Sequence, residues 1–291
     1  MPRVAPRFPY LAAAALLGAM VSLSLGTSFA KTLFPAVGAQ GANFLRLLFS
    51  AAILSCACRP WRHAWPAKRE LRMIVLYGIT IGAMTSCFYL SLRTIPFGIA
   101  TALEFTGPLA VAVLSAHRRS DYLWAALAAV GLLLLLPLRA NVAHLDVLGV
   151  MFALGAGTFW ALYIAAGKRA SKGNAGQVAA LGMVVGALLV APITVASSGL
   201  KVFEPAYLAA GLAVGLLSGA LPFGLEMLAL QRLPKRTFSI MLSAEPALSA
   251  LAGLVLLGEQ LHLLQWLAVA CVIAASIGSA SAATAEPPAI G

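Results

Sequence analysis

The chain has 291 residues, of which 61% are hydrophobic and only 10% are charged, and its mean hydropathy is +0.93. Soluble domains contain about 25% charged residues, so this composition excludes a soluble globular protein, a disordered chain, a coiled coil and a disulfide scaffold. Twenty Lys and Arg residues against nine Asp and Glu residues give a net charge of +11. The composition is typical of a polytopic membrane protein.

Long apolar runs divide the chain into segments of about 20 residues, the length that crosses a bilayer as an α-helix. Lipid admits only helices and closed barrels, and continuous apolar runs, rather than a two-residue alternation, indicate helices. The predicted spans, in chain order, are 9–30, 36–57, 73–92, 96–116, 122–138, 147–167, 176–198, 206–230, 236–257 and 261–283. We therefore expect an all-α membrane protein with ten transmembrane helices.

The basic residues predict the orientation of these helices. Loops on one side of the predicted membrane contain 15 of the Lys and Arg residues, and loops on the other side contain 4. An excess of Lys and Arg in loops is typical of the cytoplasmic side. We therefore expect both termini in the cytoplasm, and the net charge indicates orientation and not a nucleic-acid partner.

Two pairs of helix-shaping residues recur at a nearly constant distance along the chain. Gly78 and Gly82 recur as Gly215 and Gly219 after 137 residues, and Pro96 and Pro108 recur as Pro234 and Pro246 after 138. The recurrence predicts two repeats, 9–138 and 147–283, with five spans each. Because five is odd, the second repeat enters the membrane from the opposite face. Such inverted repeats are typical of secondary transporters that bind their substrate near the bilayer midplane.

Four ionisable residues lie well inside predicted spans: Arg46, Glu104, Glu226 and Glu245. An ionised side chain at the centre of a membrane helix costs roughly 3 kcal/mol, so such residues usually face a cavity or a partner. We hypothesise that Arg46 attracts a substrate carboxylate, while a glutamate binds an ammonium group or exchanges a proton. One cation cannot neutralise three carboxylates, so we expect at least one glutamate to be protonated. The alternative is that Arg46 and one glutamate form a structural pair between two helices.

Helix-breaking and aromatic residues lie near these charges. Proline has no N–H and leaves the carbonyl four residues earlier without its helical partner, which for Pro108 is the carbonyl of Glu104 and for Pro246 that of Leu242. Pro222 precedes Glu226 by one turn. Trp160 and Tyr163 on the sixth span are candidates for lining a cavity, although aromatic residues in membrane helices more often pack or anchor the interface.

No motif indicates an enzyme, a metal or a cofactor. Cys56, Cys58, Cys87 and Cys271 lack the spacing of metal ligands. A phosphate loop and a nucleophile elbow are also missing from the sequence, which argues against an ATP-driven mechanism. An intramembrane enzyme would need clustered catalytic residues, whereas the four histidines are scattered. A scaffold or sensor would need a soluble domain, for which the predicted loops are too short.

Several motifs resemble the EamA group of the drug/metabolite transporter superfamily. They lie at 43–48 (NFLRLL), 155–163 (GAGTFWALY), 95–111, 221–227, 233–238 and 245–248, and the likeness extends over about 9–283. The resemblance implies ten helices in two inverted repeats. It also implies an inner-membrane exporter of threonine, homoserine and related amino acids, driven by the proton gradient through alternating access. The alternative is an exporter of the same fold for another substrate, such as an aromatic amino acid or a xenobiotic.

Overall fold

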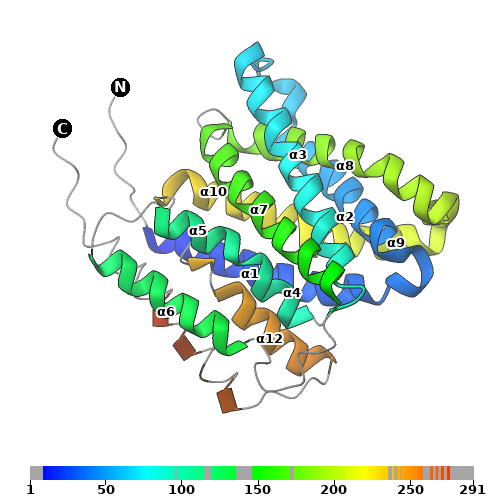
Figure 1. Ribbon diagram of the computed structural model, residues 1–291. Coiled ribbons are helices and arrows are strands. Elements are labelled where there is room, and N and C mark those ends of the chain that lie inside the picture. Colours follow the sequence, from blue (N-terminus) through cyan, green and yellow to red (C-terminus); the bar gives the residue numbers. More distant parts are fainter. Residues whose placement is uncertain are drawn as a thin grey trace.

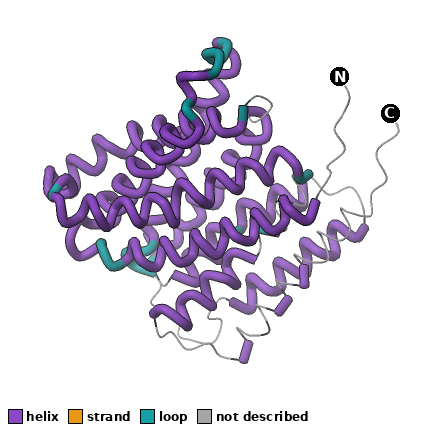
Figure 2. Tube along the Cα trace, turned by 180° about the vertical axis from the view of Figure 1, so that it is seen from behind, coloured by secondary structure: helices purple, strands orange, loops and turns teal. Residues whose placement is uncertain are grey.

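The computed structural model describes residues 9–95, 97–114, 119–135, 146–170 and 174–234, together with 238, 241–242, 244–257, 263–264, 267, 270–271 and 274–275. Helices joined by short connections make up this part of the chain, and it contains no strand (Figure 1, Figure 2). The prediction of an all-α protein is confirmed for these residues.

The helices follow one another with few intervening residues. In chain order they are α1 (Pro9–Lys31), α2 (Phe34–Cys58), α3 (Lys68–Ser91), α4 (Phe97–Glu104), α5 (Thr106–Leu114), α6 (Arg119–Leu135), α7 (Val147–Ala170), α8 (Ala175–Ser198), α9 (Pro205–Gly215), the π-helical turn η4 (Leu216–Ala220), α10 (Leu221–Arg232) and α12 (Ala244–Leu257). Two short 3₁₀ turns, η1 (Pro60–Arg62) and η3 (Gly199–Phe203), follow α2 and α8.

Six of the described helical segments are long and apolar enough to cross a membrane. They are α1, α2, α3, α7, α8 and the continuous segment from α9 through η4 to α10, which match six of the predicted spans. The predicted span 96–116 is two short helices, α4 and α5, and the predicted span 122–138 corresponds to α6. Only part of 236–257 is described, as α12, and 261–283 lies mostly outside the described residues, so the number ten stays a prediction.

The first helix exposes one apolar face, whereas its buried side chains include hydroxyl groups as well as Leu16 and Met20. Leu17, Val21 and Leu25 are spaced four residues apart and are 41–45% exposed, whereas Ser24 and Thr27 are 3% exposed. Side chains four residues apart share one face of a helix, so α1 has a continuous exposed apolar face. An exposed apolar face suits a helix that has lipid on one side.

The helices surround a common centre. α3 packs against α7 and α8, α2 packs against α8 and α9, and α1 packs against α10 and α12 (Figure 1). The half-length helix α4 packs against both α7 and α12. The segments that contain the predicted site residues therefore meet one another in the interior.

The break between α4 and α5 lies against a glycine of α7. Pro108 cannot donate to the carbonyl of Glu104, and α4 ends at that residue, as the sequence predicted. A Cβ atom added to Gly157 would lie 2.5 Å from the Glu104 carbonyl oxygen, and one added to Gly107 would collide with the Gly157 carbonyl. The broken helix and α7 are therefore in direct backbone contact.

We expect Gly157→Ala to destabilise the protein by about 1–3 kcal/mol, because a backbone carbonyl cannot move aside as a flexible side chain can. Gly155→Ala in the same helix is the matched control. Its added Cβ would lie 3.8 Å from the Cys87 sulfur, an ordinary contact. Thermal unfolding of the detergent-purified variants checks the prediction, and equal unfolding temperatures for the two variants would contradict it.

Candidate functional site

A small cavity of about 30 Å³ lies at the centre of the bundle, among residues of α1, α2, α3, α4, α7, α10 and α12. All four of the predicted intramembrane charges line it: Arg46, Glu104, Glu226 and Glu245. The remainder of the wall is formed by hydroxyl and apolar side chains, namely Ser24, Thr27, Thr85, Ser249, Leu23, Met84, Phe88, Phe97, Trp160 and Phe223. The tertiary structure therefore brings together charges that are up to 199 residues apart in the chain.

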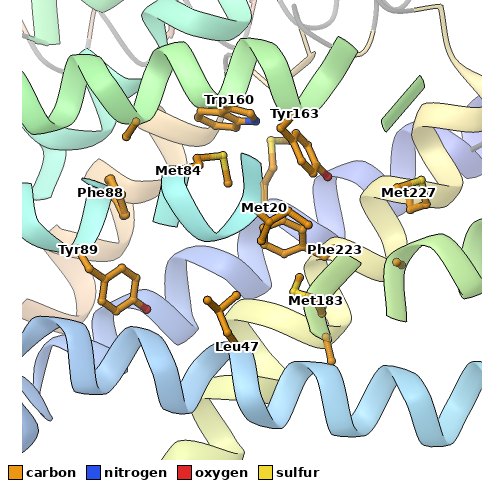
Figure 3. Close-up of a cluster of buried hydrophobic side chains, with 14 of the residues drawn as sticks. Met20, Leu47, Met84, Phe88, Tyr89, Trp160, Tyr163, Met183, Phe223 and Met227 are labelled. Carbon is orange, nitrogen blue, oxygen red and sulfur yellow. The ribbon is translucent and has the colours of Figure 1, made fainter. Parts of the chain in front are cut away.

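Arg46 is held between two aromatic rings and a backbone carbonyl. Its Nε donates to the carbonyl oxygen of Ser218 at 2.9 Å, and its Cζ lies 5.6 Å from the ring centroid of Tyr89 and 5.4 Å from that of Phe223. Guanidinium groups are attracted to aromatic faces at such distances. Figure 3 shows these two rings in the buried cluster, together with Trp160 and Tyr163 of α7. Because Nε has a partner, both Nη groups remain for a ligand.

Within the described residues, Arg46 forms no salt bridge with a carboxylate; its contacts are those with Ser218, Tyr89 and Phe223. Arg46 nevertheless interacts electrostatically with Glu104, Glu226 and Glu245, which line the same cavity. The structural-pair alternative and the substrate-binding hypothesis both remain predictions.

The carbonyl that accepts from Arg46 is available because of Pro222. The carbonyls four and five residues before this proline belong to Ser218 and Leu217, and both accept hydrogen bonds from side chains. Ser218 O accepts from Arg46, and Leu217 O accepts from the Ser22 hydroxyl of α1 at 2.6 Å. The sequence analysis associated Pro222 with Glu226 and missed Ser218, although the same four-residue rule identifies it.

The three glutamates come from three different helices and are almost fully buried. Glu104 is the last residue of α4, Glu226 lies inside α10, and Glu245 lies in the first turn of α12. Their exposed fractions are 5%, 3% and 6%. Glu226 accepts a hydrogen bond from the Tyr163 hydroxyl at 3.0 Å, whereas Oε2 of Glu245 is buried without a hydrogen-bond partner among the residues that the structure describes.

One predicted detail of the site is wrong, and one alternative that the sequence left open is resolved. The Leu242 carbonyl, which Pro246 was expected to leave without a partner, accepts from the Glu245 N–H at 2.9 Å because α12 begins with a tighter turn. Tyr163 does not line the cavity; it lies behind Glu226 and stacks on Tyr77 with ring centroids 5.2 Å apart. Trp160 does line the cavity, and its Nε1 has no hydrogen-bond partner.

Comparison with known proteins decides the family. The model of the EamA-like transporter family matches residues 147–281. The threonine/homoserine exporter RhtA of Escherichia coli (strain K12) is 47% identical over 264 residues, which are 91% of this chain and 89% of that protein. This chain belongs to the EamA-like transporter family. The resemblance in the sequence motifs is thereby confirmed, and this EamA-like protein is a multi-pass membrane protein.

Other relatives and a solved structure extend the comparison. RhtA of Salmonella typhimurium (strain LT2) is 46% identical over 94% of this chain and 92% of its own length. The uncharacterized transporter YwfM of Bacillus subtilis (strain 168) is 26% identical over 72% of this chain and 71% of its own length. One crystal structure matches with a TM-score of 0.68 and 19% identity, over 93% of this chain and 99% of that chain, which shows that the two share a fold. These relatives are named as transporters and not as enzymes.

Proposed function

We propose that this EamA-like protein exports threonine, homoserine and related small amino acids across the inner membrane in exchange for protons, by alternating access. The main support is the central cavity, which is lined by one guanidinium and three carboxylates. A free amino acid has both a carboxylate and an ammonium group, so it matches both kinds of charge. The RhtA proteins of two bacteria, named threonine/homoserine exporters, support the substrate class.

In the proposed binding mode, the substrate carboxylate accepts hydrogen bonds from the two Nη groups of Arg46. This bidentate geometry gives the strongest carboxylate contacts in proteins. The ammonium group lies against a glutamate. The hydroxyl groups of Ser24, Thr27 and Ser249 on α1 and α12 supply donors and acceptors for the substrate's own side-chain hydroxyl.

Proton coupling is proposed from the charge balance of the cavity. A zwitterionic substrate adds no net charge, so its arrival does not neutralise the excess of carboxylates over Arg46. A carboxylate that loses the ammonium group in a water-poor cavity is stabilised by taking up a proton, because an unpaired buried charge is costly. Ammonium and proton then compete for the same carboxylate, and this competition is the physical basis of an exchange.

The proposed architecture is two inverted repeats, 9–138 and 147–283, and the packing of the helices supports it. If each span corresponds to the span five later, α3 corresponds to the α9–η4–α10 span, and α2 corresponds to α8. α3 packs on α8 through Gly78 and Gly82, and the α9–η4 segment packs on α2 through Gly215 and Gly219. The contact of α3 with α7 likewise corresponds to the contact of α1 with α10. A family model that matches 147–281 alone also supports a boundary near 147.

Cytoplasmic termini are part of the same proposal, because they follow from the excess of basic residues in alternate loops. A transporter that works by alternating access exposes its central cavity to each side in turn.

The test is flux of labelled threonine out of liposomes that contain the purified protein. An external buffer about two pH units more acidic supplies roughly 2.7 kcal/mol per proton, and we expect it to accelerate threonine efflux. A protonophore should abolish the acceleration. Unlabelled homoserine should compete for the site.

The aromatic side chains in the cavity wall favour an aromatic amino acid as the second candidate substrate. Phenylalanine is therefore the matched competitor in the same assay. Stronger competition by phenylalanine, or flux indifferent to the gradient, would contradict the proposal.

A further inference from the structure

We infer that Pro222 is a positioning residue, which orients Arg46 for the substrate carboxylate by leaving the Ser218 carbonyl free. The inference rests on the proposed function of Arg46. Pro222 begins α10 directly after the π-helical turn η4, in which the Leu221 N–H donates to Leu216 O five residues earlier. An ordinary residue at 222 would direct its N–H toward the carbonyls of Leu217 and Ser218, five and four residues earlier. The proline ring has no N–H, so the Ser218 carbonyl is left to accept the hydrogen bond from Arg46.

The turn η4 gathers side-chain donors from two neighbouring helices. Arg46 Nε donates to Ser218 O, and Ser22 Oγ of α1 donates to Leu217 O. The Ser50 hydroxyl of α2 lies within hydrogen-bond distance of both Gly215 O, at 2.8 Å, and Arg46 O, at 2.5 Å. Side-chain donors of α1 and α2 therefore take backbone acceptors of η4 and the residue before it. π-helical turns inside α-helices occur frequently at functional sites.

Close packing keeps α2 within reach of this turn. A Cβ atom added to Gly215 would lie 2.5 Å from Cβ of Phe49, and one added to Gly219 would collide with the Ser50 hydroxyl. The backbone of α2 therefore lies directly against η4. Arg46, which lines the cavity, therefore reaches Ser218 O with its Nε.

The position of the guanidinium is consequently determined from three directions. The hydrogen bond to Ser218 holds Nε, and the rings of Tyr89 and Phe223 restrain the remainder of the group. A guanidinium restrained in this way loses little further conformational entropy when a carboxylate binds. If residue 222 had an N–H, that N–H would compete for Ser218 O, and the guanidinium would be free to turn away from the cavity.

The test compares threonine transport by Pro222→Ala and Pro222→Ser, each of which restores the N–H at residue 222. We expect the KM for threonine to rise about tenfold, the equivalent of one hydrogen bond to a charged group, while the maximal rate changes less than twofold. Pro192→Ala is the matched control, because Pro192 also lies inside a helix but is exposed on α8; its KM should equal that of the wild type.

A double variant separates this inference from the proposed function. The Arg46→Lys variant has no guanidinium group for Ser218 O to orient. Adding Pro222→Ala to it should therefore raise the KM for threonine no further. If Arg46→Lys alone leaves KM unchanged, the proposed carboxylate site is wrong. If Arg46→Lys raises KM but both Pro222 variants match the wild type, the carboxylate site stands and the positioning role of Pro222 is wrong. Additive effects of the two substitutions would also overturn the inference.

Discussion

Arg46→Lys is expected to lower threonine efflux at subsaturating substrate by roughly 10- to 100-fold. Hydrogen bonds to charged groups contribute about 1.5–3 kcal/mol each, and lysine cannot reproduce the pattern of bonds that arginine makes here. Arg46 uses Nε for Ser218 O and has two Nη groups left for a carboxylate. A lysine has a single nitrogen, which cannot occupy both places in the same geometry.

The measurement is initial efflux from liposomes that contain equal amounts of folded protein. Arg93→Lys is the matched control, because Arg93 is exposed and lies in a loop outside the cavity; its efflux should equal that of the wild type. Wild-type efflux by Arg46→Lys would mean that Arg46 does not bind the carboxylate.

Glu104→Gln, Glu226→Gln and Glu245→Gln are expected to separate substrate binding from proton coupling. Glutamine keeps the size of the side chain but can neither ionise nor carry a proton. One carboxylate is proposed to bind both the ammonium group and the proton. Its loss should lower proton-driven efflux and threonine–threonine exchange by the same factor, about 100-fold, because a buried charged partner is removed. Loss of a carboxylate that carries only the proton should abolish the pH dependence and leave the exchange intact.

Two assays on each variant make the assignment: efflux under an imposed pH gradient, and exchange of labelled for unlabelled threonine without a gradient. Glu204→Gln serves as control, because Glu204 is an exposed carboxylate before α9 whose side chain makes no capping hydrogen bond. If all three cavity variants kept the wild-type rate and pH dependence, the proposed mechanism would be wrong.

Much of this site could be predicted from the sequence because charge inside a membrane span is costly. An apolar run that contains Arg46 or Glu104 is conspicuous, and lipid cannot solvate either side chain. The four charges were therefore identified one by one, and the structure places all of them in one cavity. The break at Glu104 was also predictable, because the missing N–H of Pro108 acts only four residues away along the same helix.

Other features depended on contacts between helices. The sequence predicted an unpartnered carbonyl at Leu242, but the local turn at the start of α12 satisfies it. It could not distinguish Trp160, which lines the cavity, from Tyr163 one turn later, which lies behind Glu226. Both are aromatic residues of the same helix, and only the positions of α3 and α10 decide which of them meets the cavity.

From the sequence alone, composition, span length and the spacing of charges determined that the protein is a helical membrane protein with costly charges in its interior, since these are energies of single segments in lipid. The tertiary structure alone decided which group binds Arg46. The acceptor is the Ser218 carbonyl, 172 residues away, and not a glutamate. Pro222 marks the Ser218 carbonyl in the sequence as an acceptor without its helical donor, but the side chain that takes it becomes visible only when η4 and α2 pack together.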